Sequence, residues 1–423
     1  MHVIQDLLNL INKGEDLLVP FAKIHPHIKE LMIECESITS GKKDVTNCNL
    51  RQIEYILCYL HDHLNIGKWD EVAEYYRQAY TSASYMKTLI VLQLNSSFNI
   101  DKNIEVVKTA LQVIDKGFLL GLPLVSNLTL LTDCARILTK YVSENSVSSS
   151  KFNQTEELSS FPHKKQKVEH KVPVSGRPID GVVCPSIEMF RKEYFTPEKP
   201  LVIREGMTTW PAMTKWLDIN YLLNIGGDRT VPIEIGSSYS SDDFSQRLMT
   251  FRDFIKNYYN AEDGKEIGYL AQHDLLTQIP TLIEDIKVPD YCCLKRIQES
   301  DDYNDIDDVE PEINAWIGPK GTVSSLHFDP KDNLLCQVYG AKQIIMFAPS
   351  DTKYLYVYDD MPMLSNTSQV DPTNPDLSSF AEFKNATLYT CILQAGEMVY
   401  IPPKWWHHII ALEKSFSVNF WWQ

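Results

Sequence analysis

The 423-residue sequence predicts an α+β protein, in which an all-helical N-terminal domain is followed by a domain rich in β-strands. Apolar residues recur at steps of three and four through the first 143 residues, the period of amphipathic helices. Later segments such as Thr230–Ile235 alternate apolar and polar residues, as half-buried strands do. A serine-rich, charged stretch with few apolar residues separates the two patterns. We therefore predict a helical domain over 1–143 that serves protein interaction, a disordered linker over 144–173, and a second domain over 174–423.

Three stretches of the first domain carry the helical pattern most clearly. They are Trp69–Tyr80, Val107–Ile114 and Leu131–Leu138, with Gly67 and the segment 121–123 as breakers between them. The first stretch has the composition of a tetratricopeptide helix, but no fixed repeat period runs through the domain. These apolar stripes predict a helix-packing core, and a protein-binding groove is the alternative.

The second domain opens with a helical pattern over 185–195 and a strand pattern over 199–206. A short helix is predicted to begin at Phe251. The acidic run 301–310 lacks the central glycine and the register of a calcium-binding loop, so we interpret it as a solvated loop. Its negative charge would attract a basic substrate to the neighbouring cleft.

Composition limits the classes of function. The chain is 44% hydrophobic and 23% charged, which is typical of soluble globular proteins, and no apolar run approaches the roughly 20 residues of a membrane span. The N-terminus has early acids and no basic segment, so no secretory signal is expected. Nine cysteines without paired CxxC spacing predict reduced thiols inside the cell.

A formal charge of −16 argues against direct nucleic-acid binding and favours a basic protein or peptide partner. The basic cluster Lys164–Lys167 predicts a nuclear protein, although solvated linker charge explains the same residues equally well. A cytoplasmic pool is the alternative location.

The chemistry is indicated by His327-Phe328-Asp329 and a distant His407 that follows two tryptophans. On a strand, side chains two residues apart point to the same face, so His327 and Asp329 would share one space. Two imidazoles and one carboxylate form the facial triad that holds Fe(II) in non-haem oxygenases. The short pattern is not specific in a chain with 11 histidines and 56 acidic residues, and a buried hydrogen-bonded pair or a zinc site would also fit it.

Longer segments resemble a jumonji-C domain. They are EINAWIGP at Glu312–Pro319, the run from His327 through Asn333 to Lys342, and Gly396–His407. Within that family the chain is most similar to the arginyl-hydroxylase branch, on GYLAQH, NTSQVD and the ending SFSVNFWWQ. The resemblance covers about 174–423 and implies a double-stranded β-helix, or cupin-like, oxygenase that uses Fe(II), 2-oxoglutarate and O₂.

By this resemblance, the catalytic metal ligands are His327, Asp329 and His407. A buried carboxylate requires a cation, and the resemblance assigns the distal carboxylate of 2-oxoglutarate to Lys342. From the sequence alone, Lys342 could equally be a snorkelling or edge-strand lysine. The resemblance also implies that 2-oxoglutarate accepts hydrogen bonds from Tyr269, Ser324 and Asn333. Trp421 would form one wall of its pocket.

The resemblance also implies that an arginine side chain is bound by Glu234, Gln272 and Trp316. A guanidinium pairs with carboxylates and stacks on aromatic rings, so these residue types suit it. The predicted reaction is hydroxylation of an arginyl residue in a protein, with histones and other chromatin-associated or ribosomal proteins as candidate substrates.

Three other functions stay open. Demethylation of a histone H3 methyl-lysine would use the same metal site, but Asp329 and the lack of zinc-binding reader motifs favour hydroxylation. Histone-tail peptidase activity would need a motif such as HExxH, which the sequence lacks. A scaffold acting through the helical domain would not need the metal ligands. The substrate protein and the oligomeric state are left open.

Overall fold

The structure is a computed structural model that describes residues 2–11, 14–39, 44–68, 71–95, 100–146, 174, 176–236, 244–260, 266–296, 310–358, 361 and 364–423. Nearly all of the predicted linker, including its basic cluster, lies outside these ranges, as does most of the acidic run 301–310. The three-part division of the chain therefore stays a prediction.

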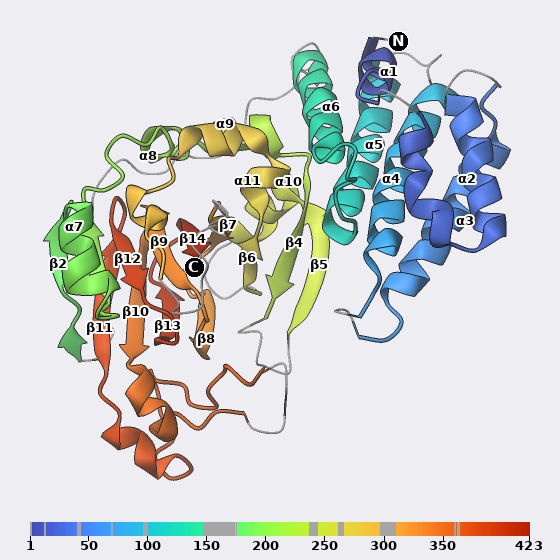
Figure 1. Cartoon of the computed structure of the whole chain (residues 1–423). Coiled ribbons are helices and arrows are strands. Elements are labelled where there is room, and N and C mark those ends of the chain that lie inside the picture. Colours follow the sequence, from blue (N-terminus) through green and yellow to red (C-terminus); the bar gives the residue numbers. More distant parts are fainter. Residues whose placement is uncertain are drawn as a thin grey trace.

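A bundle of helices forms the N-terminal part of the chain (Figure 1). Its helices are α1 (His2–Leu8), α2 (Pro26–Thr39), α3 (Asn47–Leu64), α4 (Glu74–Leu94), α5 (Ile100–Leu120) and α6 (Leu130–Ser146), with 3₁₀ turns at Gly14–Leu17 and Val19–Lys23. Helix α4 lies at the centre, because it packs against α3 on one side and α5 on the other. Residues 79–86 and 88–92 of this helix are buried, as expected for a helix surrounded by others.

The predicted apolar stripes of α5 and α6 are buried in the core of the bundle, which confirms their interpretation as helix-packing residues. The predicted helix at Trp69–Tyr80 begins later than expected. It starts at Glu74, so Val72 and Ala73 precede it, and Trp69 lies outside the described residues. Within the described ranges, no helix combines the length and apolar character that a membrane span needs.

The second part of the chain is rich in strands. It begins with β1 (Arg177–Pro178), β2 (Gly181–Val183), α7 (Ile187–Phe190), β3 (Leu201–Arg204), α8 (Ala212–Lys215), α9 (Ile219–Gly226), β4 (Thr230–Ile235), β5 (Ser245–Thr250), α10 (Phe251–Phe254), β6 (Gly268–His273) and α11 (Leu275–Gln278). It continues with β7 (Glu312–Gly318), β8 (Val323–His327), β9 (Asp332–Tyr339), β10 (Ala341–Phe347), β11 (Tyr389–Gln394), β12 (Met398–Ile401), β13 (Trp406–Ala411) and β14 (Ser415–Trp422). π-Helical turns at Arg191–Phe195 and Ile255–Tyr259 extend α7 and α10, and 3₁₀ turns lie at Pro280–Asp285, Asp290–Cys293, Pro349–Tyr354 and Ala381–Asn385. The predicted helices and strands of this part are all present.

The strands form two sheets that face each other. One sheet has the order β1-β11-β10-β13-β8, and the other has the order β2-β3-β12-β9-β14-β7-β6-β4-β5. Side chains from both sheets meet in one apolar layer, where Ile344 and Met346 of β10 pack with Leu335 of β9 and Val399 of β12. The predicted fold class is therefore confirmed, a helical region followed by a double-stranded β-helix.

The outer faces of both sheets are covered. Helices α8 to α11 pack on the large sheet, where Trp216 stacks on Phe416 with ring centroids 4.3 Å apart. The segment between β10 and β11 covers the small sheet with Leu355, Val370 and Phe383. Because apolar contacts cover both outer faces, the space between the two sheets is left for polar side chains that are buried but are not part of the core.

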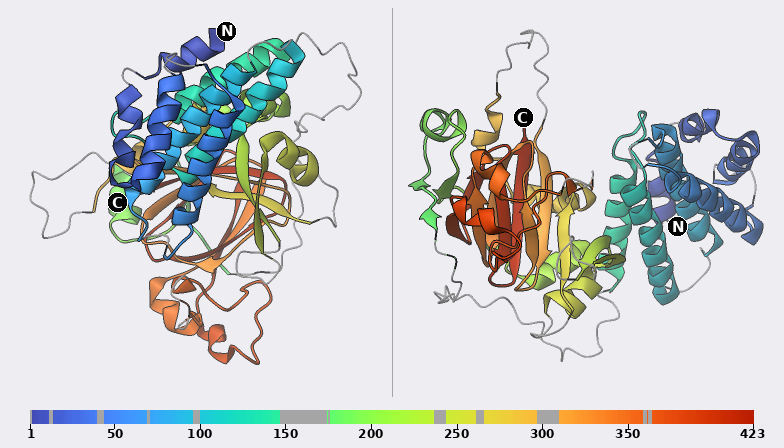
Figure 2. Two further views of the ribbon diagram at one scale, coloured as in Figure 1. Left: turned by 90° about the vertical axis from the view of Figure 1, so that its right-hand side faces the viewer. Right: turned by 90° about the horizontal axis from the view of Figure 1, so that it is seen from below.

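The helical bundle and the β-rich part lie side by side (Figures 1 and 2). Helix α5 contacts β4, and α6 contacts α9. All nine cysteines of the chain lie in described segments, and none forms a disulfide, as the composition predicted.

Candidate active site

Two histidines and one aspartate meet at one end of the space between the sheets. Strands β8 and β13 are antiparallel neighbours, His327 is the direct partner of His407, and their ring centroids are 4.3 Å apart. Asp329 Oδ2 lies 3.9 Å from His327 Nε2 and 3.5 Å from His407 Nε2. All three ligand atoms lie within 4.8 Å of one another, so among the described residues this group is suited to hold a metal ion.

The backbone explains how the three side chains converge. Strand β8 ends at His327, so Asp329 follows the strand and does not lie on it, contrary to the simple strand prediction. Its carbonyl oxygen accepts a hydrogen bond of 2.7 Å from the Lys404 amide, which ties this loop to the turn before β13. The register of β8 and β13 also shifts just after His407, and such irregularities often re-aim side chains near active sites.

Both histidines are oriented by backbone carbonyls. His407 Nδ1 lies 3.0 Å from the carbonyl oxygen of Trp405, and His327 Nδ1 lies 2.6 Å from that of Ser325. A proton on Nδ1 leaves the Nε2 lone pair for a metal. Burial, together with the neighbouring His327, lowers the pKa of His407 to about 4, which keeps this imidazole neutral as a ligand must be.

One oxygen of Asp329 is unsatisfied. Its Oδ2 is buried and has no hydrogen-bond partner among the described residues. A buried carboxylate oxygen without a donor is costly, and a cation between the two Nε2 atoms would satisfy it. The donor set of two imidazoles and one carboxylate suits Fe(II).

His408, the neighbour of His407, lies on the opposite side of the strand. It is buried, its Nδ1 has no partner among the described residues, and burial lowers its pKa to about 4. The structure therefore places His407, and not His408, in the cluster.

A cavity of about 360 Å³, its open mouth included, adjoins the cluster. Its walls are Tyr269, Trp316, Ser324, His327, Asp329, Asn333, Leu335, Lys342, His407, Ile409, Asn419 and Trp421. The metal ligands and all five residues predicted for the co-substrate therefore line one cavity.

Lys342 is the buried cation of this cavity. It is 2% exposed, and its Nζ donates to the Tyr269 hydroxyl at 3.3 Å. It lies on β10, between β11 and β13, so it is neither a snorkelling nor an edge-strand lysine. Burial lowers its pKa to about 7, and it has no carboxylate partner among the described residues. An anionic ligand would supply the missing partner.

The other predicted co-substrate residues come from β8 of the same sheet and from β6, β9 and β14 of the facing sheet. Tyr269 also hydrogen-bonds Ser324, and burial raises the pKa of its hydroxyl, which therefore stays protonated. The indole Nε1 of Trp421 is buried without a partner among the described residues. The cavity thus contains buried polar groups without a partner among the described residues, which a bound ligand would satisfy.

Asn419, Leu335 and Ile409 line the cavity but were missed from the sequence. Asn419 links the walls, because it accepts a 2.8 Å bond from Trp316 Nε1 and donates a 3.2 Å bond to Asn333 Oδ1. Strand alternation could have found all three, since Asn419 is two residues before Trp421, Leu335 is two after Asn333 and Ile409 is two after His407.

A second cavity of about 240 Å³ shares Tyr269 with the first. It contains Glu234, which pairs with Tyr269 across β4 and β6. Burial raises the pKa of Glu234 to about 7, and no basic side chain of the described residues pairs with it. Of the other predicted substrate residues, Trp316 lines the first cavity, whereas Gln272 is exposed, has a left-handed backbone (φ 44°), and lines neither. The role of Gln272 stays a prediction.

Comparison with known proteins agrees with this geometry. A family model described as a cupin-like domain matches residues 186–423. The chain is 39% identical over 373 residues to "Lysine-specific demethylase 8" of Danio rerio, covering 87% of this chain and 86% of that protein. It is 37% identical over 409 residues to the protein of the same name in Xenopus tropicalis, with 87% of each covered. "Jumonji C domain-containing protein 5" of Drosophila melanogaster is 46% identical over 248 residues, covering 58% of this chain and 60% of that protein.

The predicted resemblance is therefore confirmed, and so are the predicted cofactors, because proteins of this type use Fe(II) and 2-oxoglutarate and the three-residue cluster suits the metal. The chain belongs to the cupin-like, jumonji-C family of Fe(II)- and 2-oxoglutarate-dependent oxygenases.

Proposed function

We propose that this oxygenase acts on a basic side chain of a protein, and that hydroxylation of an arginyl residue is its reaction. One observation supports the proposal most. The cavity of the metal cluster and Lys342 adjoins a second cavity that contains the partly buried carboxylate of Glu234, and Tyr269 belongs to both. A cationic side chain held by Glu234 would reach toward the metal cluster from this side.

The residues of the first cavity would hold the cofactors. His327, Asp329 and His407 would bind Fe(II), and Lys342 would pair with the distal carboxylate of 2-oxoglutarate, with Tyr269 donating a second hydrogen bond. When bound, these groups couple the decarboxylation of 2-oxoglutarate to succinate with insertion of one oxygen atom of O₂ into a C–H bond. The protein contributes position and the exclusion of water.

Glu234 would recognise the substrate charge. Burial raises the pKa of Glu234 to about 7, which favours its neutral form, and an incoming guanidinium would favour the ionised form. The ring of Trp316 lies 6.0 Å from that of Tyr269, which is the direct strand partner of Glu234. Carboxylates and aromatic faces are the groups that a guanidinium prefers.

A second candidate is removal of a methyl group from a methylated lysine of a histone or another protein. The names of the Danio rerio and Xenopus tropicalis relatives favour this candidate over arginyl hydroxylation. The two reactions use the same metal site and differ in which C–H bond faces it. A scaffold role would leave the unsatisfied Asp329 oxygen and the buried Lys342 without a purpose.

Mass spectrometry distinguishes the candidates. The full chain is incubated with Fe(II), 2-oxoglutarate and two sets of histone-tail and arginine-rich peptides, one unmodified and one methylated on lysine. Arginyl hydroxylation predicts one added oxygen on an arginine, whereas demethylation predicts loss of a methyl group and release of formaldehyde. Oxygen added only to uncharged residues would contradict both, and the Asp329→Ala variant is the control without a metal ligand.

We also propose a nuclear location, for which the basic cluster Lys164–Lys167 is the support. A fluorescent fusion of the full chain should enter the nucleus, and replacement of the three lysines of this cluster by alanine should move it to the cytoplasm. An unchanged distribution would contradict the role of the cluster.

A further inference from the structure

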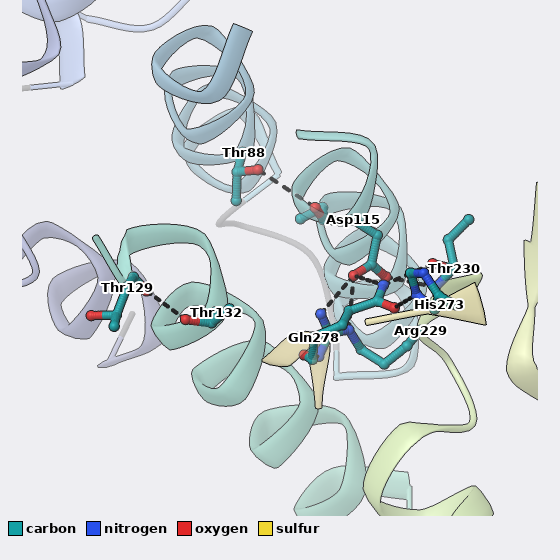
Figure 3. A network of polar contacts seen from close by, with 9 residues as sticks. Thr88, Asp115, Thr129, Thr132, Arg229, Thr230, His273 and Gln278 are labelled. Carbon is teal, nitrogen blue, oxygen red and sulfur yellow. Dashed lines mark hydrogen bonds and ion pairs between the residues drawn. The ribbon is translucent and has the colours of Figure 1, made fainter. Parts of the chain in front are cut away.

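One carboxylate of the helical bundle is buried in the β-rich part of the chain (Figure 3). Asp115 of α5 is fully buried, and its Oδ1 accepts bonds of 2.9 and 2.7 Å from Nε and Nη2 of Arg229. Its Oδ2 accepts a 2.6 Å bond from the backbone N–H of Thr230. Both of these partners are at the start of β4, so a helix of the bundle holds this end of the strand.

Gln278 extends the network to a second strand. Its Nε2 donates to Asp115 Oδ1 at 2.9 Å and to the Thr230 carbonyl at 2.8 Å. Its Oε1 lies 2.7 Å from Nε2 of His273, the last residue of β6. Burial lowers the pKa of His273, so this imidazole is neutral and donates its Nε2–H to the amide oxygen. Figure 3 shows the side chains of Asp115, Arg229, His273 and Gln278 meeting beside Thr230.

The two strands held in this way are those that carry active-site groups. Strand β4 carries Glu234, β6 carries Tyr269, and these two residues are direct partners in the sheet. Each lies four residues from its end of the network, about 13 Å along an extended strand. Strand β4 is paired with β5 from Thr230 to Ile235, so a shift at Thr230 would be transmitted along β4 to Glu234 and through their pairing to Tyr269. Strand β6 has a register irregularity between Leu270 and His273, so its own route to Tyr269 is less direct.

Stability alone is a poor explanation for such a network. A buried ion pair often contributes no more to stability than apolar residues of the same volume, because both charges must leave water. Polar networks of this kind do impose one particular arrangement, since every donor must find its acceptor. Lys108 of α5 also pairs with Asp228 at 3.4 Å, so a second polar contact fixes the same junction.

We propose that Asp115 is a positioning residue of the active site: it fixes the register of β4 and β6 and thereby places Tyr269 for the co-substrate and Glu234 for the substrate. The helical bundle is then part of the catalytic unit. The inference rests on the proposed roles of Tyr269 and Glu234, but not on the choice between hydroxylation and demethylation.

The test compares Asp115→Asn with the wild-type full chain. The variant keeps the shape of the side chain but presents an amide N–H₂ to the N–H of Thr230 or to Arg229. Asp133→Asn is the matched control, because Asp133 is a partly exposed helical aspartate paired with an arginine on the same bundle. Calorimetric titration measures the Kd of Mn(II) and then the Kd of 2-oxoglutarate for the Mn(II)-loaded protein. Hydrogen exchange is followed in β4, β6, β8 and β13.

The substitution is expected to weaken the binding of 2-oxoglutarate but not that of Mn(II). The Kd of 2-oxoglutarate should rise about tenfold in Asp115→Asn, the effect of roughly 1.4 kcal/mol, while the Kd of Mn(II) stays within about twofold. Exchange should accelerate in β4 and β6 and remain unchanged in β8 and β13, and Asp133→Asn should behave as wild type. A lower Tm with an unchanged Kd of 2-oxoglutarate, or an equal weakening of both ligands, would overturn the proposal.

Gln278→Met provides a second variant in case Asp115→Asn does not fold. It leaves the Asp115–Arg229 pair intact and removes the link to His273, so faster exchange is expected in β6 with a smaller change in β4. Unchanged exchange in both strands would contradict the positioning role. Failure of the proposed function would appear differently, as wild-type protein that binds 2-oxoglutarate but modifies no basic peptide.

Discussion

Asn366 and Phe328 exchange two hydrogen bonds. The backbone N–H of Phe328 donates to the carbonyl oxygen of Asn366 at 3.0 Å, and the side-chain amide of Asn366 donates to the carbonyl oxygen of Phe328 at 2.9 Å. Phe328 is the residue between His327 and Asp329, so this double contact holds the backbone from which two of the three metal ligands extend. The segment around Asn366 thus supports the metal site without contacting the metal position.

Asn366→Ala should weaken metal binding. The variant loses the bond to Phe328 O, so the His327–Asp329 backbone gains freedom, and loss of such supporting contacts typically costs about 10- to 100-fold in metal affinity. Calorimetric titration with Mn(II) measures the change. The control is Asn374→Ala, an exposed asparagine of the same segment. Equal Mn(II) affinity in both variants would show that Asn366 does not support the site.

Asp329→Ala should abolish specific metal binding while the fold remains. The change removes the anionic ligand and the unsatisfied buried oxygen together, so stability should be unchanged or higher in the metal-free protein. Mn(II) electron paramagnetic resonance and circular dichroism measure the two properties. Asp62→Ala, at an exposed position of α3, serves as the control. Retained stoichiometric Mn(II) binding would refute the ligand assignment.

Lys342→Met should remove 2-oxoglutarate binding and spare the metal. Loss of one partner of a buried charge pair costs about 3 kcal/mol, which corresponds to a roughly hundredfold rise in Kd. The Kd of Mn(II) should stay the same, because Lys342 is not part of the His-Asp-His cluster. Titration of 2-oxoglutarate into the Mn(II)-loaded variant measures the loss, and a change below threefold would be inconsistent with the assigned role.

The affinity for 2-oxoglutarate should fall as pH rises above about 7. Burial lowers the pKa of Lys342 to about 7, so the lysine becomes neutral above this pH, whereas carboxylate binding requires the charged form. Binding then takes up a proton, and Kd rises by at most about tenfold per pH unit. Titrations between pH 7 and 9 measure the slope. A constant Kd over this window would contradict the interpretation of Lys342.

The affinity for a basic peptide should have the opposite pH dependence. Burial raises the pKa of Glu234 to about 7, so its carboxyl is mostly neutral below this pH and mostly ionised above it. A cationic side chain binds the ionised form, and peptide affinity should therefore improve from pH 6 to 8. Fluorescence anisotropy of a labelled peptide measures it, and Glu234→Gln should weaken binding and remove the slope. If the pH dependence of peptide affinity persists in Glu234→Gln, another titrating group is its cause.

Local pattern was sufficient for much of the fold and site. Strand alternation suggested that His327 and Asp329 share one space, and the resemblance supplied His407 and the five co-substrate residues; all eight residues line one cavity. The predicted start of α4 was wrong by five residues, since helix ends depend on which residues the neighbouring elements cover. Asn419 was missed because its role depends on Trp316 and Asn333, which lie on other strands.

The sequence by itself determined the helical bundle and the strand-rich second part, since both depend on side-chain period, and the family resemblance supplied the candidate metal ligands. The tertiary structure alone decided that Lys342 is central and not at an edge, that Gln272 lines neither cavity, and that Asp115 reaches Arg229 across 114 residues. The physical reason is that such contacts arise between segments that are distant in the chain. Only the packing of the elements determines which of their side chains meet.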